Sequence, residues 1–128
     1  GEELKAHAKR LNLGDSVTFS GFVNPIEAMG RSDMIVQLSV WENCSYTLLD
    51  AKAAGLKTVA TAVGGNPEIL NADELVDRQS PKLTEEVLQA MRRQLQKGDT
   101  EPFTWISNEQ MAAQTVDIYA RVLRGGRR

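Results

Sequence analysis

Two carboxylates flank a helix start in the middle of the chain. Glu42 precedes Ser45, which can cap a helix, and Asp50 follows in the second turn of that helix. The backbone N–H groups and the positive dipole end of a helix start suit a phosphate. A carboxylate beside a phosphate is electrostatically costly unless it contacts hydroxyl groups, from which it accepts hydrogen bonds well. The pattern suits a ligand that combines a diphosphate with sugar rings, although Asp50 could equally be a solvated acid favoured by the helix dipole.

Two further loops carry residues that can approach a ligand closely. In one interpretation, Gly21 lets a flat ligand approach the backbone and Phe22 packs beside a base. In the alternative, Gly21 only turns the chain and Phe22 fills the core. Gly64 and Gly65 can direct backbone N–H groups toward an anion. Glu68 follows at a helix start, either as a ligand to sugar hydroxyls or as an acid favoured by the helix dipole. We expect these loops to converge with the Glu42 loop along one sheet edge.

Short apolar segments alternate with helical patterns along the first part of the chain. Strands are predicted at residues 17–21, 34–38, 58–61 and 74–77. Helices are predicted up to Gly14, from the Asn24 cap through Ser32, from Ser45 to Gly55, and over residues 67–71. The alternation predicts an α/β fold with a Rossmann-like, doubly wound parallel sheet, right-handed crossovers and ligands outside the carboxyl ends of the strands. Because the chain opens with a helix, we expect a further strand upstream of residue 1.

Two longer amphipathic helices are predicted to close the chain. The first follows a Ser80-Pro81 cap and the second a capping box at residues 107–110. Their apolar stripes are Leu83, Val87, Met91 and Leu95 in the first, and Met111, Thr115, Ile118, Tyr119 and Val122 in the second. We expect both stripes in the core rather than against a cofactor, because a helix gains stability by burying one face. Residues 100–103 are a predicted loop. The chain is expected to form one partial domain, with a βα core at residues 1–79, helices at 80–124 and a flexible tail at 125–128.

The composition excludes several classes of protein. The 128 residues are 41% hydrophobic and 25% charged, with a net charge of -2, so a general affinity for nucleic acid or anionic membranes is not indicated. No apolar run approaches the roughly 20 residues that span a bilayer. A single cysteine excludes an internal disulfide framework, and no spacing of His and Cys resembles a zinc site. We expect a cytoplasmic protein, with a peripheral position at the inner membrane face left open.

In the order and spacing of these motifs, the sequence resembles the C-terminal domain of retaining glycosyltransferases of the GT-B fold, the "glycosyltransferase group 1" family (family 4). The likeness runs from about residue 1 to residue 77. Residues 17–21 are similar to its strand-plus-glycine element, and Glu42 and Asp50 occupy the acidic positions of its E-x7-E motif. The segment from Gly64 to Glu68 follows the remaining pattern.

The resemblance implies transfer from a nucleotide-diphosphate sugar with retention of configuration and without a required metal or cofactor. Glu42 would be the catalytic residue that contacts the donor sugar near the reacting centre, and Asp50 would bind the ribose hydroxyls. Gly64 and Gly65 would lie against the donor sugar and its phosphate. The segment that holds the diphosphate would comprise Cys44, Ser45, Tyr46, Thr47 and Leu48. The acceptor, a glycan or a lipid-linked sugar, would be bound by an N-terminal domain.

The sequence departs from the family pattern in two ways. Asp50 stands where the family usually has glutamate, one methylene longer. The Arg and Lys that neutralise the leaving diphosphate in the family fall before residue 1, and such electrostatic stabilisation is a large catalytic term. We therefore expect negligible transferase activity from this chain alone. Three alternatives stay open: a non-catalytic nucleotide-binding or regulatory module, another GT-B enzyme such as a nucleotide-sugar epimerase or a glycogen/starch-type synthase, and a degenerate domain retained for assembly.

Overall fold

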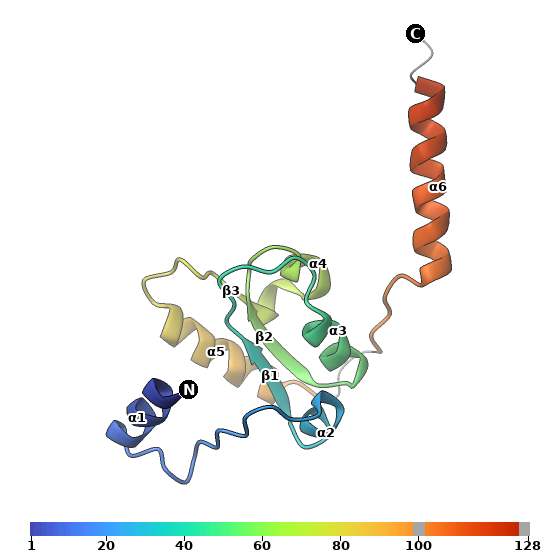
Figure 1. The fold of residues 1–128 in the computed structure, drawn as a ribbon. Coiled ribbons are helices and arrows are strands. Elements are labelled where there is room, and N and C mark those ends of the chain that lie inside the picture. The colour runs from blue at the N-terminus through green and yellow to red at the C-terminus, as the bar shows by residue number, and fades with distance from the viewer. Residues whose placement is uncertain (99–101, 126–128) are drawn as a thin grey trace. The chain divides into compact units, whose positions relative to one another are not determined.

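The computed structural model describes residues 1–98 and 102–125 (Figure 1). By its internal contacts the chain divides into two compact units, Gly1–Asp33 and Met34–Arg128. Each unit is described by itself below. Within the described residues, no helix combines the length and the apolar character that crossing a membrane requires.

The N-terminal unit contains two helices. Helix α1 spans Glu2–Arg10, with acidic residues in its first turn and basic residues in its last turn, as the helix dipole favours. Helix α2 spans Pro25–Met29, and the predicted Asn24 cap is confirmed because its side chain accepts a hydrogen bond from the N–H of Ile26 at 2.9 Å. The helix ends before Ser32, at the Gly30 cap.

The strand predicted at residues 17–21 is wrong. The segment has no strand structure, and the N–H of Val17 instead donates to Leu13 O in a turn at 3.1 Å. A strand is stabilised by hydrogen bonds to a neighbouring strand, and the three strands found in the described part of the chain pair with one another. Alternating β-branched residues indicated an extended backbone, but they do not specify a partner.

The second unit contains a three-stranded parallel sheet, which confirms the predicted α/β class. Strands β1 (Met34–Gln37), β2 (Lys57–Thr61) and β3 (Leu75–Val76) lie in the order β1-β2-β3. Met34 is aligned with Lys57, and Ala60 with Leu75. The predicted last strand is shorter than residues 74–77, because Glu74 belongs to the 3-10 helix η1 (Ala72–Glu74).

Helices pack on both faces of this sheet (Figure 1). Helix α3 (Tyr46–Ala53) and helix α4 (Asn66–Ile69) contribute Leu48 and Ile69 to a cluster around Ala60 of β2. Helix α5 (Leu83–Gln96) contributes Ala90 to a second cluster around Val59, the preceding residue of β2. Successive strand residues point to opposite faces, so burial on both sides explains why all four residues from Thr58 to Thr61 are buried.

Helix α5 confirms most of its predicted stripe. Leu83, Val87 and Met91 pack against the Val59 cluster, whereas Leu95 is 59% exposed near the end of the helix and was wrongly placed in the core. The Ser80-Pro81 signature lies before the helix rather than at its start, since the N-cap residue is Lys82. Ser80 Oγ instead accepts from the Lys82 N–H in a turn at 3.1 Å.

Helix α6 (Asn108–Gly125) confirms the capping box but not the predicted core stripe. Ser107 Oγ accepts the N–H of Gln110 at 3.2 Å, and the Gln110 side chain accepts the N–H of Ser107 at 2.9 Å. None of the helix's described residues is buried. The exposed members of the stripe are Met111, Thr115, Ile118, Tyr119 and Val122. Helical periodicity predicts which face is apolar, but it does not specify what covers that face.

Of the predicted loop at residues 100–103, Pro102 and Phe103 have no regular structure, while residues 100 and 101 lie outside the described residues. Of the predicted tail, Gly125 ends α6 and residues 126–128 lie outside the described residues.

Candidate functional site

The loops after β1 and β2 meet at the carboxyl edge of the sheet, as the sequence predicts for this pair. The N–H of Gly65 donates to Asn43 O at 2.9 Å. Gly64 adopts a left-handed backbone with φ of +52°, and a Cβ atom there would lie closer than 3.0 Å to the carbonyl oxygen of Glu42. A Cβ on Gly65 would similarly crowd Asn43 O. The close contact between the two loops is therefore one reason why glycine is required at both positions. The N–H of Gly65 already has a protein acceptor.

Glu42 is held in this loop by two side chains. Its Oε1 atom accepts hydrogen bonds from Gln37 Nε2 at 2.5 Å and from Ser39 Oγ at 2.6 Å. Ser39 O in turn accepts from Thr61 Oγ1 at the end of β2 at 2.7 Å. The half-buried Glu42 carboxylate is thus anchored to the ends of two strands, and it does not extend freely into solvent.

Gln37 is the residue of this network that the motif reading missed. It lies at the end of β1 in the otherwise apolar run from Met34 to Leu38. A polar side chain in such a run has to find hydrogen-bond partners, because an unpaired buried polar group is costly. That signal identifies Gln37 as unusual, but it does not identify Glu42 and Ser45 as the partners.

The start of α3 has the predicted Ser45 cap. Ser45 is buried, and its Oγ atom accepts the N–H of Leu48 at 3.3 Å. The carbonyl oxygen of Ser45 accepts from Leu48 and Leu49, both at 3.1 Å. The N–H groups of Tyr46 and Thr47 have no acceptor among the described residues. The donors left for the expected anion site are therefore these two N–H groups, the first two of the helix.

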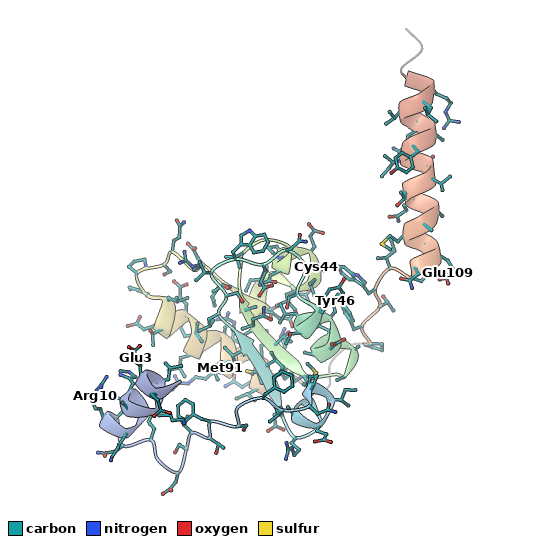
Figure 2. The ribbon with its side chains drawn as sticks, viewed as in Figure 1. Glu3, Arg10, Cys44, Tyr46, Met91 and Glu109 are labelled. Atoms are coloured by element: carbon teal, nitrogen blue, oxygen red, sulfur yellow. The ribbon has the colours of Figure 1, made fainter. Side chains whose placement is uncertain are left out.

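The side chains around this helix start differ in exposure. Cys44, Tyr46 and Thr47 are exposed, and Figure 2 labels Cys44 and Tyr46 at this end of the domain. Leu48 is fully buried in the core cluster, so its side chain supports the helix rather than contacting a ligand. Asp50 is exposed in the second turn, and its carboxylate contacts no partner among the described residues. It is free to accept hydrogen bonds from ligand hydroxyls.

Gly21 and Phe22 belong to the N-terminal unit, so the structure does not place them against these loops. Gly21 has a left-handed backbone with φ of +67° and open space where a Cβ would be. Phe22 is fully exposed, so the alternative in which it fills the core is wrong.

Glu68 lies in the first turn of α4 and lines a cavity of about 320 Å³. The opposite wall is residues 102–105, where the rings of Phe103 and Trp105 stack with centroids 6.0 Å apart. Phe103 packs against the core cluster of α3 and α4. Glu42 and the Gly64-Gly65 turn do not line this cavity, but Glu68 lies directly after that turn and its N–H donates to Gly65 O at 3.0 Å.

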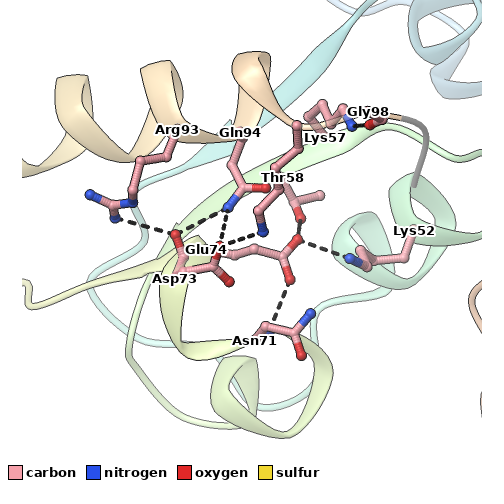
Figure 3. Close-up of polar contacts among 10 residues, drawn as sticks. Lys52, Lys57, Thr58, Asn71, Asp73, Glu74, Arg93, Gln94 and Gly98 are labelled. Carbon is pink, nitrogen blue, oxygen red and sulfur yellow. Dashed lines mark hydrogen bonds and ion pairs between the residues drawn. The ribbon is translucent and has the colours of Figure 1, made fainter. Parts of the chain in front are cut away.

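A second buried carboxylate, Glu74, supports the domain from inside (Figure 3). Its Oε1 atom accepts from Thr58 Oγ1 at 2.5 Å and from Lys52 Nζ at 2.9 Å, and its Oε2 atom accepts the Asn71 N–H at 2.9 Å. Burial alone would raise the pKa of Glu74, but the hydrogen bonds from Thr58, Lys52 and the Asn71 N–H outweigh it and lower the pKa. Because all partners are protein groups, we interpret this network as structural.

The neighbouring Asp73 attaches η1 to the end of α5. Its carboxylate pairs with Lys97. Its backbone oxygen accepts from Arg93 at 3.3 Å, and Gln94 Nε2 donates to that backbone oxygen and to Asp73 Oδ2, both at 3.1 Å (Figure 3). The hydrogen bond and charge of Lys97 lower the pKa of Asp73. Among the described residues, no group of three or more His, Cys, Asp and Glu side chains is placed to hold a metal ion.

The parallel sheet covered by helices on both faces, with a carboxylate and a helix start at its carboxyl edge, defines a Rossmann-like domain. Residues 1–110 match the family described as "Glycosyl transferases group 1". The chain therefore belongs to the group 1 glycosyltransferase family.

A curated relative is similar over part of the chain. It is the N-acetyl-alpha-D-glucosaminyl L-malate synthase of Bacillus anthracis, with 38% identity over 63 residues. The matched segment covers 48% of this chain and 16% of the relative, so it spans about a sixth of the relative's length. No solved structure matches the chain significantly.

Proposed function

We propose that this chain forms the donor half-site of a retaining glycosyltransferase, which transfers a sugar from a nucleotide-diphosphate sugar to a glycan or a lipid-linked acceptor. In this reaction the bond from the anomeric carbon to the diphosphate breaks, and a bond from that carbon to the acceptor oxygen forms. The leaving diphosphate takes the electron pair of the broken bond, and the acceptor hydroxyl gives its proton to an oxygen of that diphosphate. The observation that carries the proposal is the anchored Glu42 carboxylate, linked through Gln37 to a helix start with two N–H groups that have no acceptor in the described part of the chain.

The proposed role of each group follows from the hydrogen-bonding capacity that no described residue uses. The Tyr46 and Thr47 N–H groups would donate to phosphate oxygens at the positive end of the α3 dipole. Asp50, one turn further along, would accept hydrogen bonds from the ribose hydroxyls. Glu42 would contact the transferred sugar. Gly64 and Gly65 would shape the wall of the site by holding the Glu42 loop, in addition to any contact with the donor.

Equilibrium binding of UDP-, GDP- and ADP-sugars to the 128-residue chain tests this proposal. The relative's name makes N-acetylglucosamine the first sugar to try. We expect Asp50→Asn to weaken the binding of nucleotide and nucleotide sugar alike, because the ribose is common to both. We expect Glu42→Gln to weaken only the nucleotide sugar. Glu85→Gln, which changes an exposed acid on α5, is the matched control and should leave binding unchanged.

Two results would point to other functions. Failure of all three nucleotide sugars to bind would favour a degenerate domain retained for assembly. Binding of nucleotides with no contribution from Glu42 would favour a non-catalytic nucleotide-binding module.

The prediction that the chain alone is inactive would be contradicted by robust sugar transfer from the purified 128 residues. That the transfer requires no metal and no cofactor stays a prediction, and adding chelator to the complete reaction tests it for the metal.

A further inference from the structure

A directed series of hydrogen bonds runs from the start of α3 to Glu42. The Leu48 N–H donates to Ser45 Oγ at 3.3 Å, and Ser45 Oγ donates to Gln37 Oε1 at 2.8 Å. Gln37 Nε2 then donates to Glu42 Oε1 at 2.5 Å. Every donor in this series points toward the carboxylate, and hydrogen bonds aligned in this way polarise one another.

The charge of Glu42 explains the orientation of the Gln37 amide. A flipped amide would place Gln37 Oε1 against an ionised carboxylate oxygen, with two acceptors facing each other and no proton between them. In the observed orientation, Nε2 faces the carboxylate and Oε1 faces the Ser45 hydroxyl. One side chain thus satisfies both the acid and the helix cap.

The two oxygens of Glu42 have different surroundings. Oε1 accepts from both Gln37 and Ser39, whereas Oε2 accepts from no described residue. A half-buried carboxylate oxygen without a protein donor retains its capacity for a hydrogen bond from a ligand. Because Oε1 is fixed by two donors, the direction in which Oε2 points is fixed as well.

We propose that Gln37 is a positioning residue that makes Glu42 present a single oxygen, Oε2, to a hydroxyl group of the donor sugar. The inference rests on the proposed function. Through Ser45, Gln37 also ties the orientation of Glu42 to the helix start that would bind the diphosphate. Recognition of the sugar and of the phosphate is then coupled through one amide side chain.

The test compares the affinity of the chain for a nucleotide sugar with its affinity for the parent nucleotide diphosphate. Gln37→Met keeps the length of the side chain but removes both hydrogen-bonding groups. We expect the preference for the sugar-bearing ligand to fall about tenfold, the effect of losing one hydrogen bond to a charged group. Ser39→Ala, which removes the other donor to Oε1, is expected to reduce the same preference in a second background. Gln89→Leu, at an exposed glutamine of α5, is the control that should retain it.

A double-mutant cycle separates positioning from general stability. In a Glu42→Gln background the sugar preference is already reduced, so Gln37→Met should reduce it little further. Additive effects of the two substitutions would overturn the positioning role, as would an unchanged preference in both Gln37→Met and Ser39→Ala. If the wild-type chain binds no nucleotide sugar, the proposed function fails and the inference falls with it. If it binds and the preference survives in these variants, only the inference fails.

Discussion

Gly64→Ala tests the contact between the loops after β1 and β2. The added methyl group would lie closer than 3.0 Å to Glu42 O, and the backbone at Gly64 has φ of +52°. A non-glycine residue in the left-handed conformation costs about 1–2 kcal/mol. Forcing a methyl group into a packed region costs a further 1–3 kcal/mol or so. We therefore expect the substitution to lower the free energy of unfolding by about 2–5 kcal/mol.

Two other glycines separate the contributions of strain and crowding. Gly21 also has a left-handed backbone, with φ of +67°, but a Cβ there meets open space. Gly21→Ala should therefore show the strain alone, about 1–2 kcal/mol. Gly98 has no left-handed backbone, and a Cβ there would meet nothing within 4 Å, so Gly98→Ala should stay within about 1 kcal/mol of wild type.

Urea unfolding followed by far-UV circular dichroism measures the three free energies. Amide spectra of the folded variants show whether the Glu42 loop moves, since the carbonyl group that the methyl group of Gly64→Ala crowds belongs to Glu42. We expect the free energy of unfolding to fall most for Gly64→Ala, less for Gly21→Ala and least for Gly98→Ala. A Gly64→Ala variant as stable as Gly21→Ala, with the Glu42 loop undisturbed, would refute the account of why glycine is required there.

Three further predictions concern the buried acid and the helix caps. Because the pKa of Glu74 is lowered in the folded state, its stabilisation is complete above the ordinary pKa of 4.5 and is lost as the pH falls through the folded-state value. Glu74→Gln should flatten the acid limb of a stability–pH curve, and an unchanged limb would argue against the network. Lys52→Met leaves the buried Glu74 without its cation and should lower the free energy of unfolding in urea by about 3 kcal/mol. A decrease of less than about 1 kcal/mol would contradict this prediction. Ser107→Ala should reduce the stability of helix α6 by about 1 kcal/mol, measured as smaller helical carbon chemical shifts in its first turn. Thr104→Ala lies outside the cap and should leave these shifts unchanged.

The sequence predicted the sheet of the second unit because its signals are local and redundant. The run from Met34 to Leu38 is apolar apart from Gln37, and Val59 and Ala60 carry apolar side chains on the two faces of β2, which is typical of strands between two helical layers. The Asn24, Ser45 and Ser107 caps were found because a cap depends on residues within one turn. Motif order placed Glu42 and Gly64 on loops that do meet.

The features that the sequence did not predict depend on partners far along the chain. Residues 17–21 have strand propensity but no paired strand, and the apolar face of α6 has no described residue covering it. Gln37 was missed because its partners, Glu42 and Ser45, are specified by loop geometry rather than by a motif. Glu74 was counted as part of a strand, although its role depends on Lys52 and Thr58, 22 and 16 residues away.

The central claim is that the carboxyl edge of this sheet binds a nucleotide-diphosphate sugar. Titrating UDP-, GDP- and ADP-N-acetylglucosamine into isotopically labelled chain, with amide spectra at each step, tests it most directly. We expect saturable shifts with at least one of the three ligands at Tyr46 and Thr47, whose N–H groups have no acceptor among the described residues, and at Glu42 and Asp50. Shifts confined to other parts of the chain, or none with any of the three donors, would contradict it.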